Sequence, residues 1–401
     1  MVLDAPYPED GRVTKEAVAL MRAGHEVYLL CVRRPGEPRR EEVAGVRVRR
    51  LRRGTSLFAK TAWDSVNALL WRHPVFARGV RRFVAEDRIE VLHVHDLPLA
   101  GTVAAVARRR EIPWVLDLHE NFPAGLQIWM EHKTNPLVRL KNKLLMSYDR
   151  WEAYEGRMVG AASRVIAVVD EMRERLTRVH GTPTQKISIV TNSEWRDFME
   201  QFQSVDEVAR SYPGKFVILY LGYFGPHRGV DTVVEAMPAV VERIPEAVFV
   251  VVGRGSYQPY LEGLAARLGM TRNVDFAGFK PYAEVGSWMQ RADVNIIPHK
   301  RNDHTDNTVP HKLFQSLLAG KATVVSDAPP LKRLAEETGG AFVFEAENAG
   351  SLAQLIVRLA SDPEAVRARA NSGLAAAREG RFNWDTDQQH LLEIYSDFIR
   401  G

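Results

Sequence analysis

The feature that most constrains the fold is an alternation of short apolar runs with helix-period segments, which occurs twice along the chain. The apolar runs are rich in β-branched residues, as is typical of strands buried on both faces of a parallel sheet. Amphipathic helical segments separate them. We therefore predict an α/β protein with two doubly wound, Rossmann-like domains. The predicted strands are 27–32, 91–94, 114–118, 165–169 and 187–190, then 216–221, 247–252, 274–276, 294–297 and 322–325. The predicted helices are 12–23, 59–71, 74–86, 100–110, 136–160 and 171–179, then 229–243, 257–268, 282–290 and 311–319.

The domain break is predicted in a polar segment between residues 198 and 215. This segment ends in Ser211-Tyr-Pro-Gly214 and precedes a fresh strand, F-V-I-L-Y-L-G. The 401 residues are enough for two domains of about 150–200 residues each. We predict a first domain over 1–200 and a second over 214–383. In domains of this kind ligands bind at the carboxyl ends of the strands, so the motifs of interest should follow strands.

The composition is that of an ordinary soluble globular protein, with 45% hydrophobic and 26% charged residues. No run of about 18 apolar residues predicts a membrane span, and the N-terminus has no secretion signal, so we expect a cytoplasmic protein. The single Cys31 lies in an apolar run, which favours core packing and excludes an intrachain disulfide. No cluster of His, Cys, Asp and Glu has the spacing of a metal site, and we predict none.

Positive charge is concentrated in the first half of the chain. Residues 1–200 carry 33 lysines and arginines against 26 acidic residues, whereas the remainder carries 21 against 24. Arginines gather over 33–53 and 72–82, with Trp63, Leu69 and Leu70 between them. Such a face is either solvated surface or a contact for an anionic membrane, which would place the protein on the inner face of the membrane. We expect no nucleic-acid partner.

The stretch T-D-N-T-V-P-H-K-L-F-Q-S-L-L-A-G-K-A-T-V-V-S-D, residues 305–327, carries the strongest functional signal. It reads as a loop, a helix that begins at Pro310 and stops at Gly320, and a buried strand. Lys312 and the free N–H groups of the helix N-terminus suit an anionic ligand, typically phosphate.

This stretch resembles the donor-binding signature of the retaining, nucleotide-sugar-dependent glycosyltransferases of family 4 (group 1, GT-B fold). In that family two glutamates eight residues apart flank the helix start, and here those positions are Asn307 and Gln315. The resemblance implies that Gln315 binds the ribose and Asn307 the sugar of the donor. It also places Pro310, His311 and Leu313 at the donor, and implies that a last helix over 384–401 crosses back to the first domain.

Two motifs of the first domain fit the same resemblance. The loop P-E-D-G-R brings Gly11 to a helix start, a suitable approach for phosphate. In V-L-D-L-H-E-N-F-P, a strand delivers His119 and Glu120, and the resemblance implies that His119 contacts the transferred sugar. Glu120 is assigned to the acceptor side, as a base, a hydrogen-bonding group or a helix cap. His93–Asp96 ends the preceding strand and has either a pocket or a structural role.

Three motifs of the second domain follow strands as well. In Y-L-G-Y-F-G-P-H-R the family's two diphosphate-binding cations correspond to Tyr223 and Arg228, so one cation is replaced by a phenol. The loop V-V-V-G-R-G brings Gly253 to the border of the nucleotide. In F-A-G-F-K, Phe279 and Lys280 are expected beside the base, with core packing of the aromatic ring as the alternative.

The resemblance implies a metal-independent, retaining transfer of a sugar from a UDP- or GDP-type donor to an acceptor hydroxyl. Such an enzyme would act in the synthesis of cell-envelope polysaccharide, glycolipid or glycoconjugate, on an acceptor that is soluble or lipid-linked. The catalytic residues would be His119, Arg228 and Lys312, with no cofactor beyond the donor. Two alternatives stay open: a degenerate GT-B protein that binds a nucleotide sugar or a partner without turnover, and a sugar-nucleotide 2-epimerase. We expect Gln315→Glu to tighten nucleotide binding, because it restores the family's carboxylate.

Overall fold

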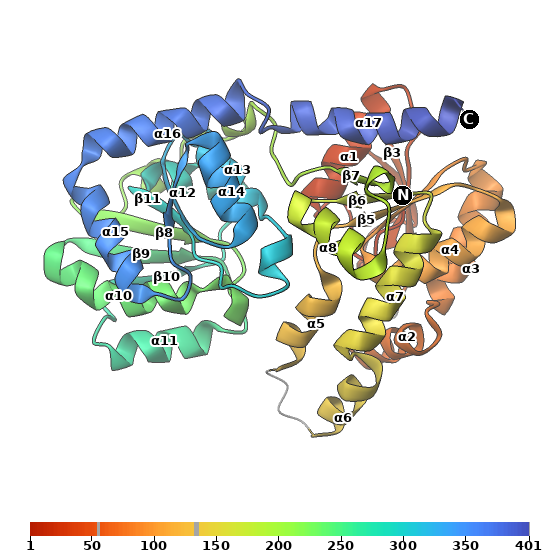
Figure 1. The fold of residues 1–401 in the computed structure, drawn as a ribbon, viewed down its shortest axis with the longest axis horizontal. Helices are drawn as coiled ribbons and strands as arrows, with labels where there is room; N and C mark the ends of the chain where they lie inside the picture. Colours follow the sequence, from red (N-terminus) through yellow and green to blue (C-terminus); the bar gives the residue numbers. More distant parts are fainter. Residues whose placement is uncertain (54–56, 132–135, 401) are drawn as a thin grey trace. The chain divides into compact units, whose positions relative to one another are not determined.

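The computed structural model describes residues 1–53, 57–131 and 136–400. The chain forms two compact units: unit 1 comprises residues 1–191 and 387–401, and unit 2 comprises residues 192–386. Each unit is an α/β assembly built mainly of parallel strands (Figure 1). None of the helices in the described ranges is long and apolar enough to cross a bilayer.

The sheet of unit 1 has four parallel strands in the order β4-β5-β6-β7, and a three-stranded group in the order β1-β3-β2 beside it. Val2 joins the two groups, because it forms parallel bridges to both Leu30 and Val94. The strands are β1 Tyr28–Val32, β2 Arg40–Val43, β3 Val46–Leu51, β4 Leu92–His95, β5 Trp114–Leu118, β6 Arg164–Ala167 and β7 Ile187–Ile189.

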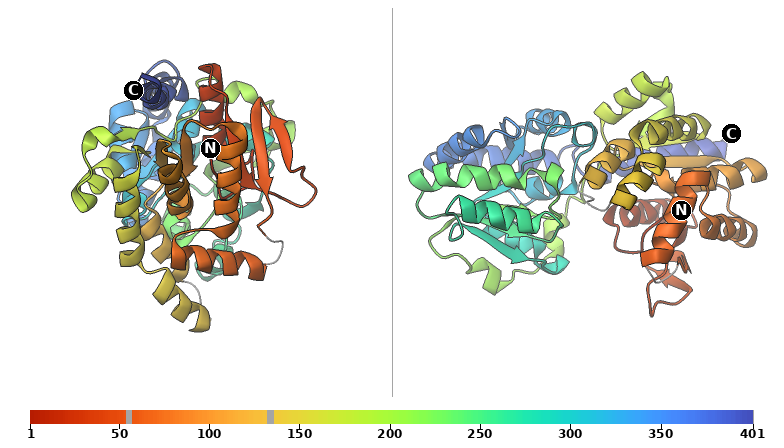
Figure 2. Two further views of the ribbon diagram at one scale, coloured as in Figure 1. Left: turned by 90° about the vertical axis from the view of Figure 1, so that its right-hand side faces the viewer. Right: turned by 90° about the horizontal axis from the view of Figure 1, so that it is seen from below.

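Helices cover both faces of this sheet, as the two views in Figure 2 show. They are α1 Gly11–Arg22, α2 Leu57–Leu70, α3 Pro74–Asp87, α4 Ala100–Arg110, α5 Phe122–Glu131, α6 Pro136–Leu145, α7 Tyr148–Ala161, α8 Asp170–His180 and α17 Trp384–Arg400. The single helix predicted over 136–160 is wrong. Ser147 has extended backbone angles before Tyr148 and separates α6 from α7.

The hairpin β2–β3 was not predicted, because its arginines obscured the strand pattern. Ala44 and Gly45 form its turn, with φ of 51° and 84°. The second of these positive angles falls on a glycine, which adopts it without strain. Buried and exposed residues alternate along β3, with Val46 and Val48 buried. Most arginines of residues 33–53 form ion pairs, so acidic residues compensate much of their positive charge. The pairs are Arg34–Glu9, Arg40–Glu86, Arg47–Glu26, Arg49–Asp87, Arg50–Glu41 and Arg53–Asp4.

The sheet of unit 2 is wholly parallel, in the order β10-β9-β8-β11-β12-β13. Its strands are β8 Phe216–Leu221, β9 Ala247–Val252, β10 Val274–Gly278, β11 Val294–Ile297, β12 Ala322–Ser326 and β13 Ala341–Phe344. Its helices are α9 Asp206–Ala209, α10 Val230–Arg243, α11 Gln258–Arg267, α12 Val285–Arg291, α13 His311–Leu318, α14 Pro329–Thr338, α15 Ala349–Ser361 and α16 Pro363–Arg378.

Two apolar layers enclose this sheet, and the pleat of the strands decides which residue joins which layer. Ile218 and Tyr220 of β8 lie in the layer that α10, α11 and α15 cover. Val217 and Leu219 lie in the opposite layer, beside Trp288 of α12. Residues on both faces are therefore apolar, as the continuous runs in the sequence predicted.

The segment 192–213 packs on unit 2. The Asn192 side chain donates to the carbonyl oxygen of Val309, and the N–H of Val205 donates to Ser287 Oγ. The α17 helix, by contrast, contacts unit 1: Tyr395 Oη hydrogen-bonds with His93 Nδ1 at 2.9 Å. The chain thus leaves unit 1 after Thr191 and returns to it at Asp387.

Candidate functional site

The candidate site of unit 2 lies at the carboxyl ends of its strands, where glycines let three loops approach one another. A Cβ atom at Gly253, after β9, would stand 2.0 Å from the carbonyl oxygen of Gly222, after β8. Gly229 has φ of 69°, and a Cβ atom there would stand 1.6 Å from the carbonyl oxygen of Pro298, after β11. Only glycine fits either position, so the sequence fixes how these loops meet.

Two cations lie together in this loop cluster. Lys312, in the first turn of α13, places its Nζ 3.9 Å from the centre of the Tyr220 ring and 3.4 Å from a Cβ atom built on Gly222. Burial and the nearby charge of Arg228 hold the pKa of Lys312 well below its usual range. Within the described part of the chain no carboxylate forms an ion pair with Lys312 or Arg228. Arg228 and Lys312, together with the first turn of α13, therefore make an anion-binding site.

Neutral histidines surround these cations. Burial and the charge of Arg228 lower the pKa of His227 to about 2, and the same causes hold that of His299 well below its usual range. The neutral ring of His299 accepts a hydrogen bond from Arg228 Nη1 through Nε2 at 3.1 Å. His299 therefore orients the guanidinium without adding charge. The sequence reasoning missed it, although its place two residues after a predicted strand was a usable signal.

The other predicted residues of these loops have distinct contacts. Tyr223 is 56% exposed, and its phenol lies 3.2 Å from Ser256 Oγ, which links the loops after β8 and β9. Phe279 is 65% exposed, and the Arg254 guanidinium lies 5.0 Å from its ring centre. The core-packing alternative for Phe279 is therefore wrong. Lys280 places its Nζ 5.6 Å from the ring centre of Trp288.

The start of α13 shows which predicted residues can offer a side chain to a ligand. Asn307 is half-buried and donates to the carbonyl oxygen of Asp303 at 2.7 Å. Pro310 is the residue before the first helical turn, and its carbonyl oxygen accepts from the N–H of Leu313. The Leu313 side chain is fully buried in the core, so it cannot touch a donor. His311 and Lys312 are half-buried.

Gln315 has an acidic partner that the sequence did not suggest. Its Nε2 donates to Glu194 Oε1 at 3.0 Å, and His311 Nδ1 lies 3.5 Å from the same oxygen. Glu194 stands 121 residues earlier in the chain, so no local pattern connects it with α13. A carboxylate is therefore present beside the position where this chain lacks the glutamate of the family pattern.

In unit 1 the start of α1 differs from the predicted phosphate loop. The Asp10 carboxylate caps the helix and accepts from the N–H groups of Arg12 and Val13 at 3.0 and 3.1 Å. A Cβ atom at Gly11 would meet nothing within 4 Å, so steric demand does not explain this glycine. An anionic cap already occupies two of the N–H groups that a phosphate would use.

A buried cluster centred on Asp117 lies at the end of β5. Asp117 accepts from Arg12 Nη2 at 2.9 Å, from His95 Nδ1 at 3.0 Å and from His119 Nε2 at 2.7 Å. The charges of Arg12 and His119 outweigh burial and hold the pKa of Asp117 well below its usual range. Burial opposes charge on His119 too, but Asp96 and Asp117 outweigh it and raise the pKa of His119 to about 10. His119 is therefore an imidazolium at neutral pH. Glu120, which follows it, is half-buried.

Four residues of this cluster have the ligand chemistry of a metal site: ligand atoms of Glu16, His93, His95 and Asp117 lie within 4.8 Å of one another. The sequence showed no such grouping, because strand ends and a helix bring distant residues together. Arg12 places its Nε 3.0 Å from Glu16 Oε1 and also pairs with Asp117. A guanidinium thus already supplies the cation that these carboxylates need, and the absence of a metal stays a prediction.

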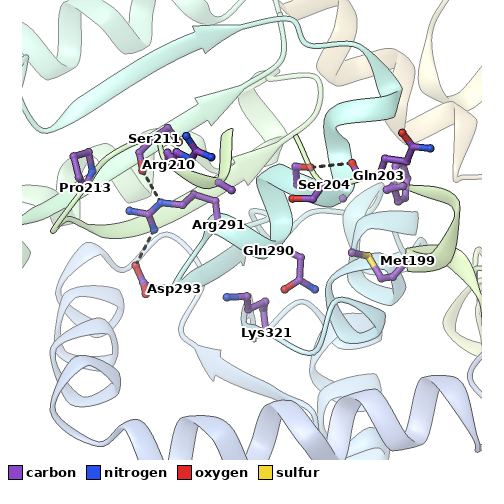
Figure 3. Close-up of a pocket in the computed structure, with 14 residues that line it drawn as sticks. Met199, Gln203, Ser204, Arg210, Ser211, Pro213, Gln290, Arg291, Asp293 and Lys321 are labelled. Atoms are coloured by element: carbon purple, nitrogen blue, oxygen red, sulfur yellow. Dashed lines mark hydrogen bonds and ion pairs between the residues drawn. The ribbon is translucent and has the colours of Figure 1, made fainter. Parts of the chain in front are cut away.

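A hollow of about 820 Å³ in unit 2 includes none of the predicted site residues. It lies beside the amino-terminal ends of the strands, because Asp293 and Lys321 of its lining precede β11 and β12. Figure 3 shows the Arg291 guanidinium directed at the carbonyl oxygen of Ser211 and at Asp293. The arginine is thus used to hold the chain, and the hollow is separate from the candidate site.

Comparison with known proteins agrees with this geometry. Residues 12–193 match the model of the glycosyl transferase 4-like domain, and residues 201–375 match that of the glycosyl transferases group 1. The chain therefore carries a glycosyl transferase 4-like domain followed by a glycosyltransferase group 1 domain. A relative of this glycosyltransferase is the phosphatidyl-myo-inositol mannosyltransferase of Mycolicibacterium smegmatis, 23% identical over 98% of the chain and 90% of the relative.

Solved structures establish the fold of this glycosyltransferase as GT-B. Sucrose-phosphate synthase from Thermosynechococcus elongatus superposes with a TM-score of 0.79 at 17% identity, over 99% of this chain and 95% of the other. HepE of Anabaena, solved in complex with UDP-glucose, superposes with a TM-score of 0.73 at 15% identity, over 99% and 98% of the two chains. The predicted fold class, with two Rossmann-like domains, is confirmed.

Proposed function

We propose that this glycosyltransferase transfers a sugar from a nucleotide-diphosphate sugar to an acceptor hydroxyl, with retention of configuration and without a divalent cation. The observation that carries the proposal is the pair of basic residues that no carboxylate compensates in the described part of the chain: Arg228, just before α10, and Lys312, in the first turn of α13. The diphosphate of a UDP- or GDP-type donor would supply the negative charge that compensates these two residues. The complex of HepE with UDP-glucose supports this donor class.

The cation pair would act on the leaving group. When the bond between the sugar and the diphosphate breaks, negative charge grows on the departing β-phosphate. Arg228 and Lys312 would stabilise that charge, which is the kind of term that contributes most in such sites. The same phosphate oxygen would take the proton of the acceptor hydroxyl as it attacks from the same side, so configuration is retained. Metal independence follows, because the protein supplies the positive charge.

His119 would orient the transferred sugar. Its Nε2–H donates to Asp117, and its Nδ1 lies 3.5 Å from Asp96 Oδ1. A sugar hydroxyl would therefore approach the Nδ1 side, where the carboxylate of Asp96 can accept a hydroxyl proton as well. Gln315 and Asn307 remain the residues proposed to lie at the ribose and at the sugar of the donor.

The test is turnover with a panel of UDP- and GDP-sugars, with and without EDTA. Arg228→Met and Lys312→Met should each lower turnover about 10²–10³-fold with an unchanged melting temperature, as expected for loss of a transition-state donor. Lys332→Met, on the exposed side of α14, is the matched control. Turnover that EDTA abolishes and magnesium restores would refute metal independence. The anomeric configuration of the product, read by NMR, tests retention.

One observation favours the second candidate, a GT-B protein that binds a nucleotide sugar without turnover. The position of the family's other diphosphate cation is Tyr223, whose phenol is engaged with Ser256. Stabilisation by UDP-glucose or a GDP-sugar, with no transfer to any acceptor and no hydrolysis, would establish this alternative. A ligand at about 100 times its dissociation constant adds about 2.7 kcal/mol to the free energy of unfolding, so its binding is readily detected.

We propose a lipid-linked acceptor and peripheral attachment to the inner face of the membrane, with a role in cell-envelope polysaccharide, glycolipid or glycoconjugate synthesis. Leu69 and Leu70 at the end of α2 are each 59% exposed, and Arg72 follows them. Because most arginines of residues 33–53 are paired with acidic residues, we propose this end of α2 as the membrane contact. Liposome co-sedimentation should depend on anionic lipid and decrease with salt. Liposome binding that depends on neither anionic lipid nor salt would exclude this attachment. The double variant Leu69→Ser, Leu70→Ser should bind liposomes more weakly.

A further inference from the structure

The segment 192–194 holds the start of α13 at two points. The Asn192 side chain donates to the carbonyl oxygen of Val309 at 2.9 Å, just before the helix. Glu194 Oε1 accepts from Gln315 Nε2 at 3.0 Å and lies 3.5 Å from His311 Nδ1. His311 and Gln315 are four residues apart and share one face of α13, so one carboxylate oxygen contacts both.

The position of Glu194 is itself fixed. Its carbonyl oxygen accepts the N–H of Trp384 at 2.8 Å. Its side chain is 10% exposed, which is unusual for a glutamate unless it is paired. The charge of Glu194 also acts on Tyr282. Burial, and after it the charge of Glu194, raises the pKa of the Tyr282 phenol to about 12. The structure thus holds a carboxylate in a defined place beside the first turns of α13.

Carboxylate and amide differ in what they can offer a vicinal diol. A carboxylate only accepts hydrogen bonds and has about four acceptor sites, whereas an amide has one acceptor oxygen and two donor hydrogens. Gln315 Nε2 and His311 Nδ1 both lie at Oε1, one of the two carboxylate oxygens of Glu194. The pair therefore presents the negative charge and the acceptors that an isolated Gln315 lacks.

We propose that Glu194 supplies the carboxylate that binds the ribose hydroxyls of the donor, with Gln315 as the residue that positions it. This inference rests on the proposed function and assigns a specific group within that site. It also changes the expected outcome of Gln315→Glu. A second carboxylate 3.0 Å from Glu194 would repel it and raise the pKa of one of the two groups, so the variant should not bind nucleotide more tightly.

The experiment is a calorimetric comparison of UDP and GDP with their 2′,3′-dideoxy forms, using the full chain. Glu194→Gln should weaken UDP or GDP about tenfold or more, as for loss of a charge-assisted hydrogen bond. The affinity of the same variant for the dideoxy nucleotide should fall by less than about twofold, because that nucleotide lacks the ribose hydroxyls that Glu194 would bind. Glu207→Gln, an exposed glutamate of α9 in the same unit, is the matched control and should change neither.

A swap separates the ribose contact from a structural tie. The double variant Glu194→Gln, Gln315→Glu keeps one carboxylate and one amide and should restore binding of the ribose nucleotide to within about threefold. Equal losses for the ribose and dideoxy forms in Glu194→Gln would overturn the inference and assign Glu194 to the fold. If the wild-type chain binds neither UDP nor GDP, the proposed function itself fails. The two failures are therefore distinct.

Discussion

The charge of His119 gives a prediction whose size follows from the structure. Asp96 and Asp117 raise the pKa of His119 from 6.5 to about 10. Replacement by glutamine leaves an amide that can donate to Asp117 but carries no charge at any pH. The imidazolium contributes its full stability below pH 6.5, and this contribution is lost as the pH rises through about 10. A rise of this size corresponds to about 5 kcal/mol in the free energy of unfolding.

The assay compares urea unfolding of the His119 and His119→Gln chains from pH 6.5 to 10.5. Both should carry Glu16→Gln, because burial and Asp117 raise the pKa of Glu16 to about 8 and its titration falls in the same range. The stability difference between the two chains should shrink by several kcal/mol across this range. A difference that stays constant with pH, or a histidine NMR titration near pH 6.5 for His119, would refute the account of the cluster.

Further outcomes follow from the same geometry. Arg12→Met should lower the free energy of unfolding by about 3–5 kcal/mol, because it removes the guanidinium that pairs with both Glu16 and Asp117 in the buried cluster. Adding Glu16→Gln should recover part of this loss, and chemical unfolding measures both variants. Gly229→Ala should lower the melting temperature and the nucleotide affinity, because its Cβ atom would overlap the carbonyl oxygen of Pro298. Gly160→Ala, with open space around the added Cβ atom, should leave the melting temperature unchanged or raise it. Equal effects of the two substitutions would contradict this reasoning. At a pH above the pKa of Lys312 in the free protein, binding of UDP or GDP should be coupled to proton uptake, because a bound phosphate favours the charged amine. Calorimetry in buffers of different ionisation enthalpy measures this uptake, and Lys312→Met should abolish it.

The parallel framework was predictable, because strands buried on both faces are written as continuous apolar runs. The predicted strands 216–221 and 247–252 coincide with β8 and β9. The β2–β3 hairpin was not predicted for the opposite reason, since a run of valines that alternate with arginines is also typical of a charged surface. Its turn, Ala44-Gly45, was the available local signal.

The candidate site was predictable only where one segment carries it. The loop and helix around Lys312 were found from consecutive residues, whereas the partners of that helix come from elsewhere in the chain. Glu194 meets Gln315 across 121 residues, and Arg12 meets Asp117 across 105 residues. Such pairs depend on how the strands are ordered in the sheet, which the composition of a single segment does not encode. Strand-end positions of His299 and Asp117 were nevertheless readable hints.

The return of α17 to unit 1 has a consequence for the order in which the protein matures. Unit 2 is continuous in the chain, but unit 1 needs residues 387–401, including the buried Leu391 and Tyr395, to close its core. During synthesis the domain that emerges first therefore waits with an uncovered apolar surface while the second domain is made and folds. The buried polar cluster of His93, Glu16 and Asp117 is sealed last, when Tyr395 arrives. For this chain the usual N-to-C order of domain folding is reversed in its final step, and the early domain is the one exposed to chaperones and proteases.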